Sequence, residues 1–226
     1  MKQSNNIINV AVDIESLSLR ADAAILSIAA VSFDISPEFS GQTERNPFLK
    51  FKDKNFYEVI NATTCALHGM DFDMETVRWW AAKGEEAKAC LLSETPLGIV
   101  EALSSFHAYL ESLKEEYHSD LRIWAQGTDF DIAVLRNAYR NILPGTPTPW
   151  HYKNVRDSRT FITMILECAF GYEEHPYDRI PPMPDGEVWV KHSALSDARK
   201  LAWNVSYCYG LCRSGIGRTS SGAIRE

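Results

Sequence analysis

Two acidic side chains at the end of an apolar segment near the N-terminus could do chemistry. Asp13 and Glu15 follow a run that predicts a buried strand over residues 7–14. Because alternate side chains of a strand point to opposite faces, both carboxylates emerge on the same face. Neighbouring carboxylates repel each other unless a proton or a cation lies between them. The pair alone is more typical of a solvated turn, but it also suits a hard cation such as Mg²⁺ or Mn²⁺.

Two further acidic signals lie far downstream. Asp131 follows a predicted strand and Gly127, close to the predicted start of a helix, where capping is an alternative explanation for an acid. His192 comes directly before the last predicted helix, and Asp197 lies one turn inside it. Ser193 can cap that helix. A single histidine in such a place is usually a surface residue, and its pairing with an acid at this spacing indicates a possible site.

The elements that must position these residues are predicted from apolar periodicity and from Gly and Pro signals. Strands are expected over residues 7–14, 23–33, 46–52, 121–126 and, at an edge, 153–157. Helices are expected over residues 74–92, 95–113, 132–142, 159–170 and 195–209. Residues 171–190 are rich in Pro, Tyr and acids and are expected to form a long loop, with a small hairpin at residues 184–186 as one option.

The order of these elements predicts the fold class. Three strands in succession predict an antiparallel meander, and the later alternation of strands and helices adds parallel strands. The expectation is an α/β fold, a mixed five-stranded sheet with helices on both faces. A chain of 226 residues suits one such domain, expected over residues 1–212, with a weakly ordered tail over residues 213–226.

Charge and cysteine content exclude several classes of protein. Acids outnumber bases by 30 to 23, which argues against a broad basic face for duplex DNA. Nucleic acid in a narrow cleft stays possible, because metal ions can supply positive charge there. The five scattered cysteines complete no zinc pattern. Residues 1–9 lack the build of a signal peptide, and no stretch approaches the roughly 18 apolar residues of a membrane span. We therefore expect a cytoplasmic protein with no membrane partner.

Taken together, the motifs resemble those of the DEDDh 3′–5′ exonucleases, the DnaQ-like branch of the ribonuclease H-like fold. The three motifs are Asp13-Ile14-Glu15, Gly127-x-x-Phe130-Asp131 and His192-x4-Asp197. A narrower resemblance is to the subgroup of phage exonuclease A, the nuclease part of exonuclease VIII and the mycobacterial-type exoribonucleases. The stretches that carry it are residues 22–28, 76–80, 156–160 and 192–198. The resemblance covers residues 7–210 and implies a ribonuclease H-like sheet.

This resemblance implies an activity and a mechanism. The four acids Asp13, Glu15, Asp131 and Asp197 would hold two Mg²⁺ or Mn²⁺ ions. His192 would be the general base for the attacking water, a role that suits imidazole because its unperturbed pKa lies near the working pH. The implied activity is metal-dependent release of nucleoside 5′-monophosphates from the 3′ end of single-stranded RNA or DNA. Relatives in this fold commonly pair, so a homodimer is a further expectation.

The resemblance also suggests contacts to the terminal nucleotide. It places Ser16 at the sugar and Leu17 at the base, with Ser16 standing where the family more often has threonine. Phe130 could pack beside the sugar, although a place in the core is the stronger expectation. We assign the second motif to Asp131 rather than Asp129 because Asp131 completes the Phe-Asp dipeptide, and Asp129 would then only cap the helix.

Several alternatives stay open. Trp79 and Trp80 could stack on a base, but tryptophans on an amphipathic helix are usually core residues, which is the expectation for both. Residues 156–159 could form an ion-pair network, or Arg159 could face phosphates. A catalytically silent nucleic-acid-binding protein should have lost a metal ligand or the histidine, and all five are present. An oligoribonuclease restricted to very short RNA is the narrower enzymatic alternative.

Overall fold

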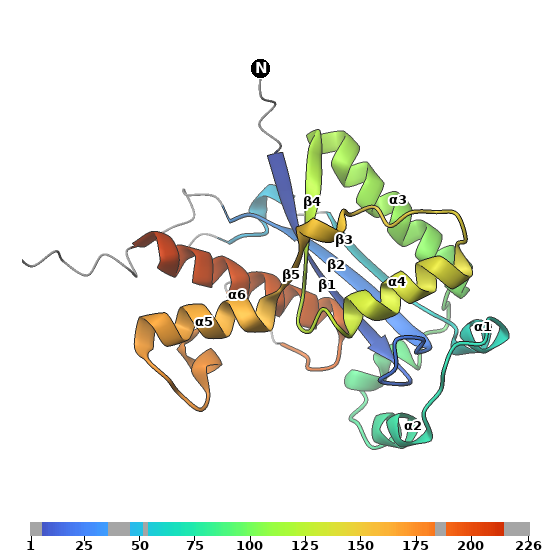
Figure 1. Ribbon diagram of the computed structural model, residues 1–226. Helices are drawn as coiled ribbons and strands as arrows, with labels where there is room; N and C mark the ends of the chain where they lie inside the picture. Colours follow the sequence, from blue (N-terminus) through green and yellow to red (C-terminus); the bar gives the residue numbers. More distant parts are fainter. Residues whose placement is uncertain (1–5, 36–45, 52–53, 184–188, 215–226) are drawn as a thin grey trace, which may run out of the picture.

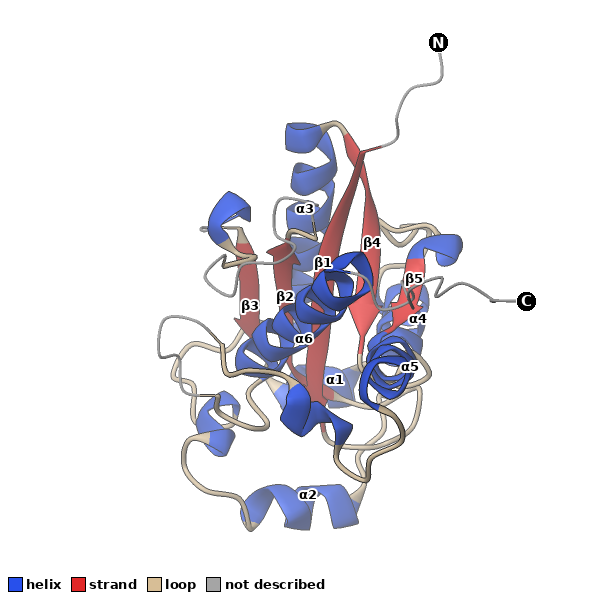
Figure 2. Cartoon of the chain, turned by 90° about the vertical axis from the view of Figure 1, so that its left-hand side faces the viewer, coloured by secondary structure: helices blue, strands red, loops and turns tan. Residues whose placement is uncertain are grey.

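A mixed five-stranded sheet forms the centre of the molecule (Figures 1 and 2). The computed structural model describes residues 6–35, 46–51, 54–183 and 189–214. The strand order is β3-β2-β1-β4-β5, with β1 antiparallel to β2, β2 antiparallel to β3, and β4 parallel to both β1 and β5. The strands are β1 (Asn6–Ser16), β2 (Ile25–Phe33), β3 (Asn55–Val59), β4 (Ser119–Ala125) and β5 (Val155–Asp157). The predicted α/β fold, with its meander and added parallel strands, is confirmed.

Helices cover both faces of this sheet. Helix α6 crosses one face with α5 beside it, and α3 lies behind the other face (Figure 2). The helices are α1 (Ala62–Leu67), α2 (Met74–Ala81), α3 (Ile99–Tyr117), α4 (Asp131–Ile142), α5 (Ser158–Phe170) and α6 (Ala194–Ser214). Short 3₁₀ helices are η2 (Leu49–Phe51), η3 (Ala87–Cys90), η4 (Tyr152–Asn154) and η5 (Pro176–Arg179).

The alternation of side chains along β1 decides which face carries its acids. Val10 and Val12 are buried in the core on the α3 side, whereas Ala11 is buried in the core under α6. Asp13 and Glu15 continue the alternation of Ala11. Both carboxylates therefore face the side of the sheet on which α6 lies.

Strand β1 also extends beyond the end of its parallel neighbour. The last register pair between β1 and β4 joins Ala11 to Trp124, while the pairing of β1 with β2 continues to the end of β1. Asp13 and Glu15 thus lie past the carboxyl end of β4. In sheets of this kind the crevice beyond the carboxyl ends of the strands is the usual place for a ligand.

The predicted strand at residues 46–52 is wrong. Residues 46–51 are a turn followed by η2, residue 52 lies outside the described residues, and the third strand is Asn55–Val59. The side-chain oxygen of Asn46 accepts a hydrogen bond from the Phe48 amide at 2.9 Å, which is the mark of an Asx turn, and Pro47 has no N–H to give to a ladder. Phe48 and Phe51 are buried, but they lie on the turn and on η2 and not on a strand.

The single helix predicted at residues 74–92 is also wrong in its second half. Helix α2 ends at Ala81, and η3 follows after Gly84, a residue that destabilises a helix interior by about 1 kcal/mol. The hairpin at residues 184–186 lies outside the described residues. So does the predicted tail, except for residues 213 and 214, which belong to α6. Among the described residues, no helix is long and apolar enough to cross a membrane.

One aspartate ties the turn after β4 to α5. Asp157 ends β5, and one of its oxygens accepts from the Thr160 amide at 2.8 Å as the cap of α5. Its other oxygen accepts from the amides of Gly127 and Thr128, each at 3.1 Å. Gly127 has φ of 109°, a conformation that favours glycine. Asp157 therefore fixes the turn that leads into Asp131.

We expect Asp157→Ala to lower the free energy of unfolding by about 1–3 kcal/mol, because it removes a helix cap and leaves two amides of the turn unpaired. Urea unfolding followed by circular dichroism measures the change. Asp129→Ala is the matched control, since Asp129 is exposed on the same turn and should change stability by less than about 0.5 kcal/mol. Equal losses in the two variants would contradict the structural role of Asp157.

Candidate active site

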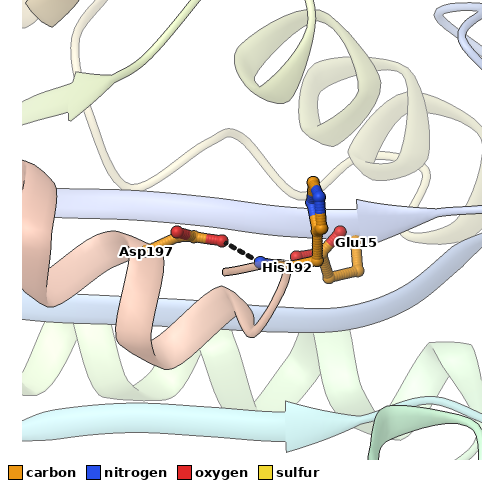
Figure 3. A group of neighbouring side chains, drawn as sticks. All are labelled: Glu15, His192 and Asp197. Atoms are coloured by element: carbon orange, nitrogen blue, oxygen red, sulfur yellow. Dashed lines mark hydrogen bonds between the residues drawn. The ribbon is translucent and has the colours of Figure 1, made fainter. Parts of the chain in front are cut away.

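The five residues predicted from the motifs line one cavity of about 440 Å³. We name it the acidic pocket. It lies where the end of β1, the start of α4 and the start of α6 meet. Ligand atoms of Glu15, His192 and Asp197 lie within 4.8 Å of one another in it (Figure 3). The other two acids of the motifs, Asp13 and Asp131, line the same pocket.

The two acids of β1 are unusually reluctant to ionise. Burial raises the pKa of Asp13 well above its ordinary value, and the charges of Asp131, Glu15 and Asp197 raise it further. Burial, followed by repulsion from Asp197 and Asp131, raises the pKa of Glu15 to about 8. Both shifts have the same physical cause, a negative charge that has lost water and gained like-charged neighbours. Glu15 therefore holds a proton at neutral pH unless a cation replaces it.

Asp131 is joined directly to the acidic end of β1. It is 4% exposed, and its Oδ1 accepts a hydrogen bond from the Ile14 amide at 3.2 Å. Burial raises its pKa to about 7, against the opposing effects of the bonds from Ile14 and its own amide and of the Arg159 charge. Asp129, the competing residue of this motif, is exposed. The geometry thus supports the choice of Asp131.

Asp197 explains the spacing of the third motif. Its Oδ2 accepts from the backbone amide of His192 at 2.8 Å, and its Oδ1 accepts from Nε1 of Trp189 at 2.6 Å. The first bond uses the amide and not the imidazole ring of His192 (Figure 3). It also holds His192 at a φ of 67°, a left-handed conformation that few residues other than glycine adopt. Burial raises the pKa of Asp197, and these two bonds oppose the rise.

The imidazole of His192 lies against α2. Its ring centroid is 4.7 Å from that of Trp79, in an edge-to-face arrangement. Burial and the ammonium of Lys83 lower the pKa of His192, Asp197 opposes them, and Lys191 lowers it further. The ring is therefore neutral at neutral pH and can accept a proton.

The two tryptophans of α2 have different roles, and the expectation that both are core residues is wrong for Trp79. Trp80 is 2% exposed, and its Nε1 donates to the backbone oxygen of Ser16 at 2.9 Å. Trp79 is 41% exposed and contacts His192. Successive helical residues point about 100° apart, so two adjacent tryptophans do not share one buried face. That spacing was the signal that could have separated them.

A second cavity of about 370 Å³ lies between the end of β1 and α2. We name it the α2 pocket. It shares Ile14, Glu15 and Phe130 with the acidic pocket, so Phe130 packs on the core and also lines both cavities. Ser16 lines the α2 pocket too, with its hydroxyl donating to the backbone oxygen of Ser18 at 2.8 Å.

Leu17 does not line either of these two cavities. It is 7% exposed and belongs to the core. Leu19, which the sequence analysis did not select, is 79% exposed and lines the α2 pocket. The strand ends at Ser16, so the alternation that located the acids no longer applies to the residues that follow.

Three cations also line the acidic pocket, namely Arg159, Lys191 and Lys200. Arg156 donates instead to the backbone oxygens of Lys153 and Val155, a structural role. Within the segment 156–159, Arg156 therefore has a structural role and Arg159 lines the pocket. With four acids facing three cations, a bound divalent ion would reverse the sign of the net charge in the pocket and would make the pocket attractive to a phosphodiester.

The acidic pocket fits hard divalent cations. Its acids bring carboxylate oxygens, the ligands that Mg²⁺ and Mn²⁺ prefer, from three separate elements. The raised pKa values of Asp13, Glu15 and Asp131 show that their charge is poorly compensated by the protein alone. A divalent cation would supply that compensation.

Comparisons with known proteins agree with this site. A family model described as the 3′–5′ exoribonuclease Rv2179c-like domain matches residues 8–209. An exodeoxyribonuclease of Enterobacteria phage T4 is 23% identical in an alignment 223 residues long that covers 88% of this chain and 90% of the phage protein. The zinc-bound ExoI of E. coli in complex with single-stranded DNA has a similar structure, with a TM-score of 0.52 and 15% identity.

The match to ExoI covers 92% of this chain and 41% of the ExoI chain, so this protein spans less than half of that enzyme. At this identity the likeness shows the fold, and it confirms the predicted ribonuclease H-like sheet. The family model, in contrast, spans nearly all of the described core. The chain therefore belongs to the 3′–5′ exoribonuclease Rv2179c-like domain family, within the DEDDh-type 3′–5′ exonucleases.

Proposed function

We propose that this protein hydrolyses single-stranded RNA or DNA from the 3′ end and releases nucleoside 5′-monophosphates by a metal-dependent reaction. The observation that carries the proposal is the meeting of four acids and a neutral histidine in one pocket. The four acids are spread along the chain from residue 13 to residue 197. Separate structural roles would give no reason for all four to lie in one pocket.

Asp13, Glu15, Asp131 and Asp197 would hold two Mg²⁺ or Mn²⁺ ions. Bound ions of this kind activate water and stabilise the charge that develops on a leaving oxygen. His192 takes the proton from the attacking water, since its lowered pKa leaves the ring neutral and its place beside Glu15 brings it into the pocket.

Asp197 accepts a hydrogen bond from the backbone amide of His192, so the same acid would position the base and act as a ligand of the ions. Arg159, Lys191 and Lys200 supply positive charge at the walls, where they attract and orient the phosphates of the strand. Trp79 packs against the imidazole and limits the positions that the ring can take.

The α2 pocket is the proposed place of the 3′-terminal nucleotide. It opens from the acidic pocket past Glu15 and Phe130, so a nucleotide in it keeps its 5′ phosphate at the acids. Ser16 lines it where the resemblance puts the sugar. Leu19 and Trp79 provide apolar surface for a base.

The proposal covers RNA and DNA because the similar proteins differ in their substrates. The family description names RNA, whereas the phage relative is named for DNA and the ExoI structure contains single-stranded DNA. A cytoplasmic location and a homodimer stay predictions from the sequence, as does a single domain over residues 1–212.

The first test measures the release of nucleoside monophosphates from 3′-ended single-stranded RNA and DNA in Mg²⁺, Mn²⁺ or EDTA. We expect release with a metal ion and none in EDTA. Loss of even an outer partner of a metal ligand costs 10–100-fold in affinity or activity, so Asp13→Ala and Asp131→Asn should lower the rate by at least about 100-fold. Asp129→Asn is the matched control for the second motif, and its rate should stay within about twofold of the wild-type rate. A substitution at such a surface position usually changes the free energy of unfolding by about 0.5 kcal/mol or less.

Two outcomes of this assay would contradict the proposal. No release under any metal condition would remove the enzymatic function. Full activity in Asp13→Ala, or a greater loss in Asp129→Asn than in Asp131→Asn, would show that the site is assigned to the wrong acids.

A second test separates the base from the ion ligands. We expect His192→Ala to lower kcat by about 10²–10⁴-fold, the usual contribution of general base catalysis. Mn²⁺ affinity, measured by calorimetry on the same variant, should change far less. His68→Ala, at an exposed histidine after α1, is the control. A kcat equal to that of wild type would remove His192 as the base.

The third test uses the pH dependence of stability. Without metal, the pKa values of about 8 for Glu15 and about 7 for Asp131 mean that the folded protein binds more protons than the unfolded chain between about pH 4 and 8. The free energy of unfolding then falls as pH rises through this range. In EDTA, we expect the Tm of Glu15→Gln to exceed that of wild type by a margin that grows from pH 5 to pH 8.

Divalent ions should reverse this trend, because they bind only the ionised carboxylates. The rise in Tm that Mg²⁺ or Mn²⁺ gives to wild type should be larger at pH 8 than at pH 5, and smaller in Glu15→Gln. A metal-free difference between the two proteins that is constant with pH would contradict the raised pKa of Glu15.

A further inference from the structure

The indole of Trp189 binds one of the four acids although Trp189 belongs to none of the motifs. Its Nε1 donates to Oδ1 of Asp197 at 2.6 Å, while the backbone amide of His192 donates to Oδ2 at 2.8 Å. Both oxygens of this carboxylate are therefore bonded to the segment that precedes α6. Trp189 lines the acidic pocket and is 39% exposed, and the proposed reaction assigns it no role.

The backbone next to Trp189 is fixed to the first turn of α6. The amide of Val190 donates to Oγ of Ser196 at 2.9 Å, and the amide of Ser193 donates to the backbone oxygen of Val190 at 3.3 Å. Ser196 and Asp197 are consecutive residues of α6, so both bind the same short segment. These bonds restrict the direction in which the Trp189 side chain leaves the backbone.

The ring of Trp189 is held at its face as well as at its edge. Nζ of Lys200 lies 3.1 Å from the ring centroid. An aromatic ring is negative on its face and positive at its edge, so the indole receives an ammonium on its face and directs its N–H at a carboxylate. The salt bridges between described residues do not include Lys200. The ammonium thus lies on the ring, and the Asp197 carboxylate stays open to another cation.

The two bonds to Asp197 leave room for metal ions. An ionised carboxylate has about four lone-pair positions, and the bonds from Trp189 and His192 occupy one position on each oxygen. Such charge-assisted bonds are strong and fix the orientation of the carboxylate. Among the described residues, Asp197 is the only one of the four acids that accepts a hydrogen bond from another side chain. That donor belongs to Trp189.

We propose that Trp189 is a positioning residue of the divalent cation site. Its N–H holds the Asp197 carboxylate in one orientation, in which the carboxylate acts as a ligand. The proposal rests on the proposed function, in which Asp197 binds the ions. In this role Trp189 contacts neither the ions nor the strand, so its removal acts first on metal affinity. Partners that hydrogen-bond to metal ligands typically contribute about 10–100-fold to metal affinity or activity.

The experiment measures Mn²⁺ binding to the full chain by calorimetry, without nucleic acid. Trp189→Phe keeps an aromatic ring for Lys200 and removes the N–H. We expect its Kd for Mn²⁺ to be about 10–100-fold higher than that of wild type. Trp189→Gln offers an N–H at the same number of bonds from Cβ, so it should bind Mn²⁺ more tightly than Trp189→Phe does. Circular dichroism confirms that each variant is folded.

Trp203→Phe is the matched control, because it also removes an indole N–H from a hydrogen bond close to the site. Nε1 of Trp203 donates to the backbone oxygen of Pro181 at 2.7 Å and not to an acid. The Kd of Trp203→Phe for Mn²⁺ should therefore equal that of wild type within error.

A second readout separates positioning from contact with the strand. The rate of nucleotide release from single-stranded RNA or DNA is measured while the Mn²⁺ concentration is raised. We expect Trp189→Phe to need about 10–100-fold more Mn²⁺ for half of its maximal rate, and to approach the wild-type rate when Mn²⁺ is saturating. A residue that acted on the strand would lower the rate at every Mn²⁺ concentration.

The outcomes separate this proposal from the proposed function. Wild type that binds no Mn²⁺ would overturn both. Wild type that binds Mn²⁺ no more tightly than Trp189→Phe would overturn the role of Trp189 alone. Equal losses of affinity in Trp189→Phe and Trp203→Phe, or a Trp189→Gln that binds no better than Trp189→Phe, would also overturn it. So would a rate in Trp189→Phe that stays low at saturating Mn²⁺ while its Mn²⁺ affinity is unchanged.

Discussion

The burial of four carboxylates in one pocket is the constraint on which the rest of this structure depends. Burial raises the pKa values of Asp13, Glu15, Asp131 and Asp197, and the charges of neighbouring acids of the pocket raise those of Asp13 and Glu15 further. The folded chain can relieve the repulsion with protons or with divalent cations. In the proposed function, stability, pH dependence and nuclease chemistry are therefore linked through the same four side chains, and a site that would bind cations destabilises the chain when they are absent.

The fold holds the acids together by geometry that is set far from them. Strand β1 lies in the middle of the sheet and extends past the end of β4. The acids at the end of β1 therefore lie at the carboxyl end of the sheet, where β4 does not cover them. Helix α6 begins over that end on the same face. Helix α4 begins at a place where Asp131 can accept a hydrogen bond from the Ile14 amide. Because these supports are a central strand and two helix starts, the acids are placed by rigid elements, as a site that needs close positioning requires. The left-handed conformation of His192 is retained because Asp197 binds its amide.

The sequence predicted the parts of the protein that depend on period and order. Strand β1 and helices α3, α4 and α6 follow clear periodicities, and the motifs located the acids and the histidine that the structure brings together. What failed depended on contacts between distant residues or on local turns. Asn46 forms an Asx turn where a strand was predicted. Leu17, the first residue after β1, lies in the core, although a contact with a base was predicted for it. The cavity lined by Tyr177, Trp189 and Trp203 combines a 3₁₀ segment, a loop tryptophan and one face of α6, which no spacing in the sequence brings together.

The most direct test of the electrostatic constraint is to count the protons that leave when Mn²⁺ binds. Calorimetric titrations of metal-free protein in buffers of different ionisation enthalpy give that number together with the number of ions bound. We expect two ions per chain, with at least one proton released at pH 7, fewer at pH 9, and a loss of both binding and release in Asp13→Asn. Saturable binding without proton release at pH 7, or binding unchanged in Asp13→Asn, would contradict a site in which repelling carboxylates hold protons until cations replace them.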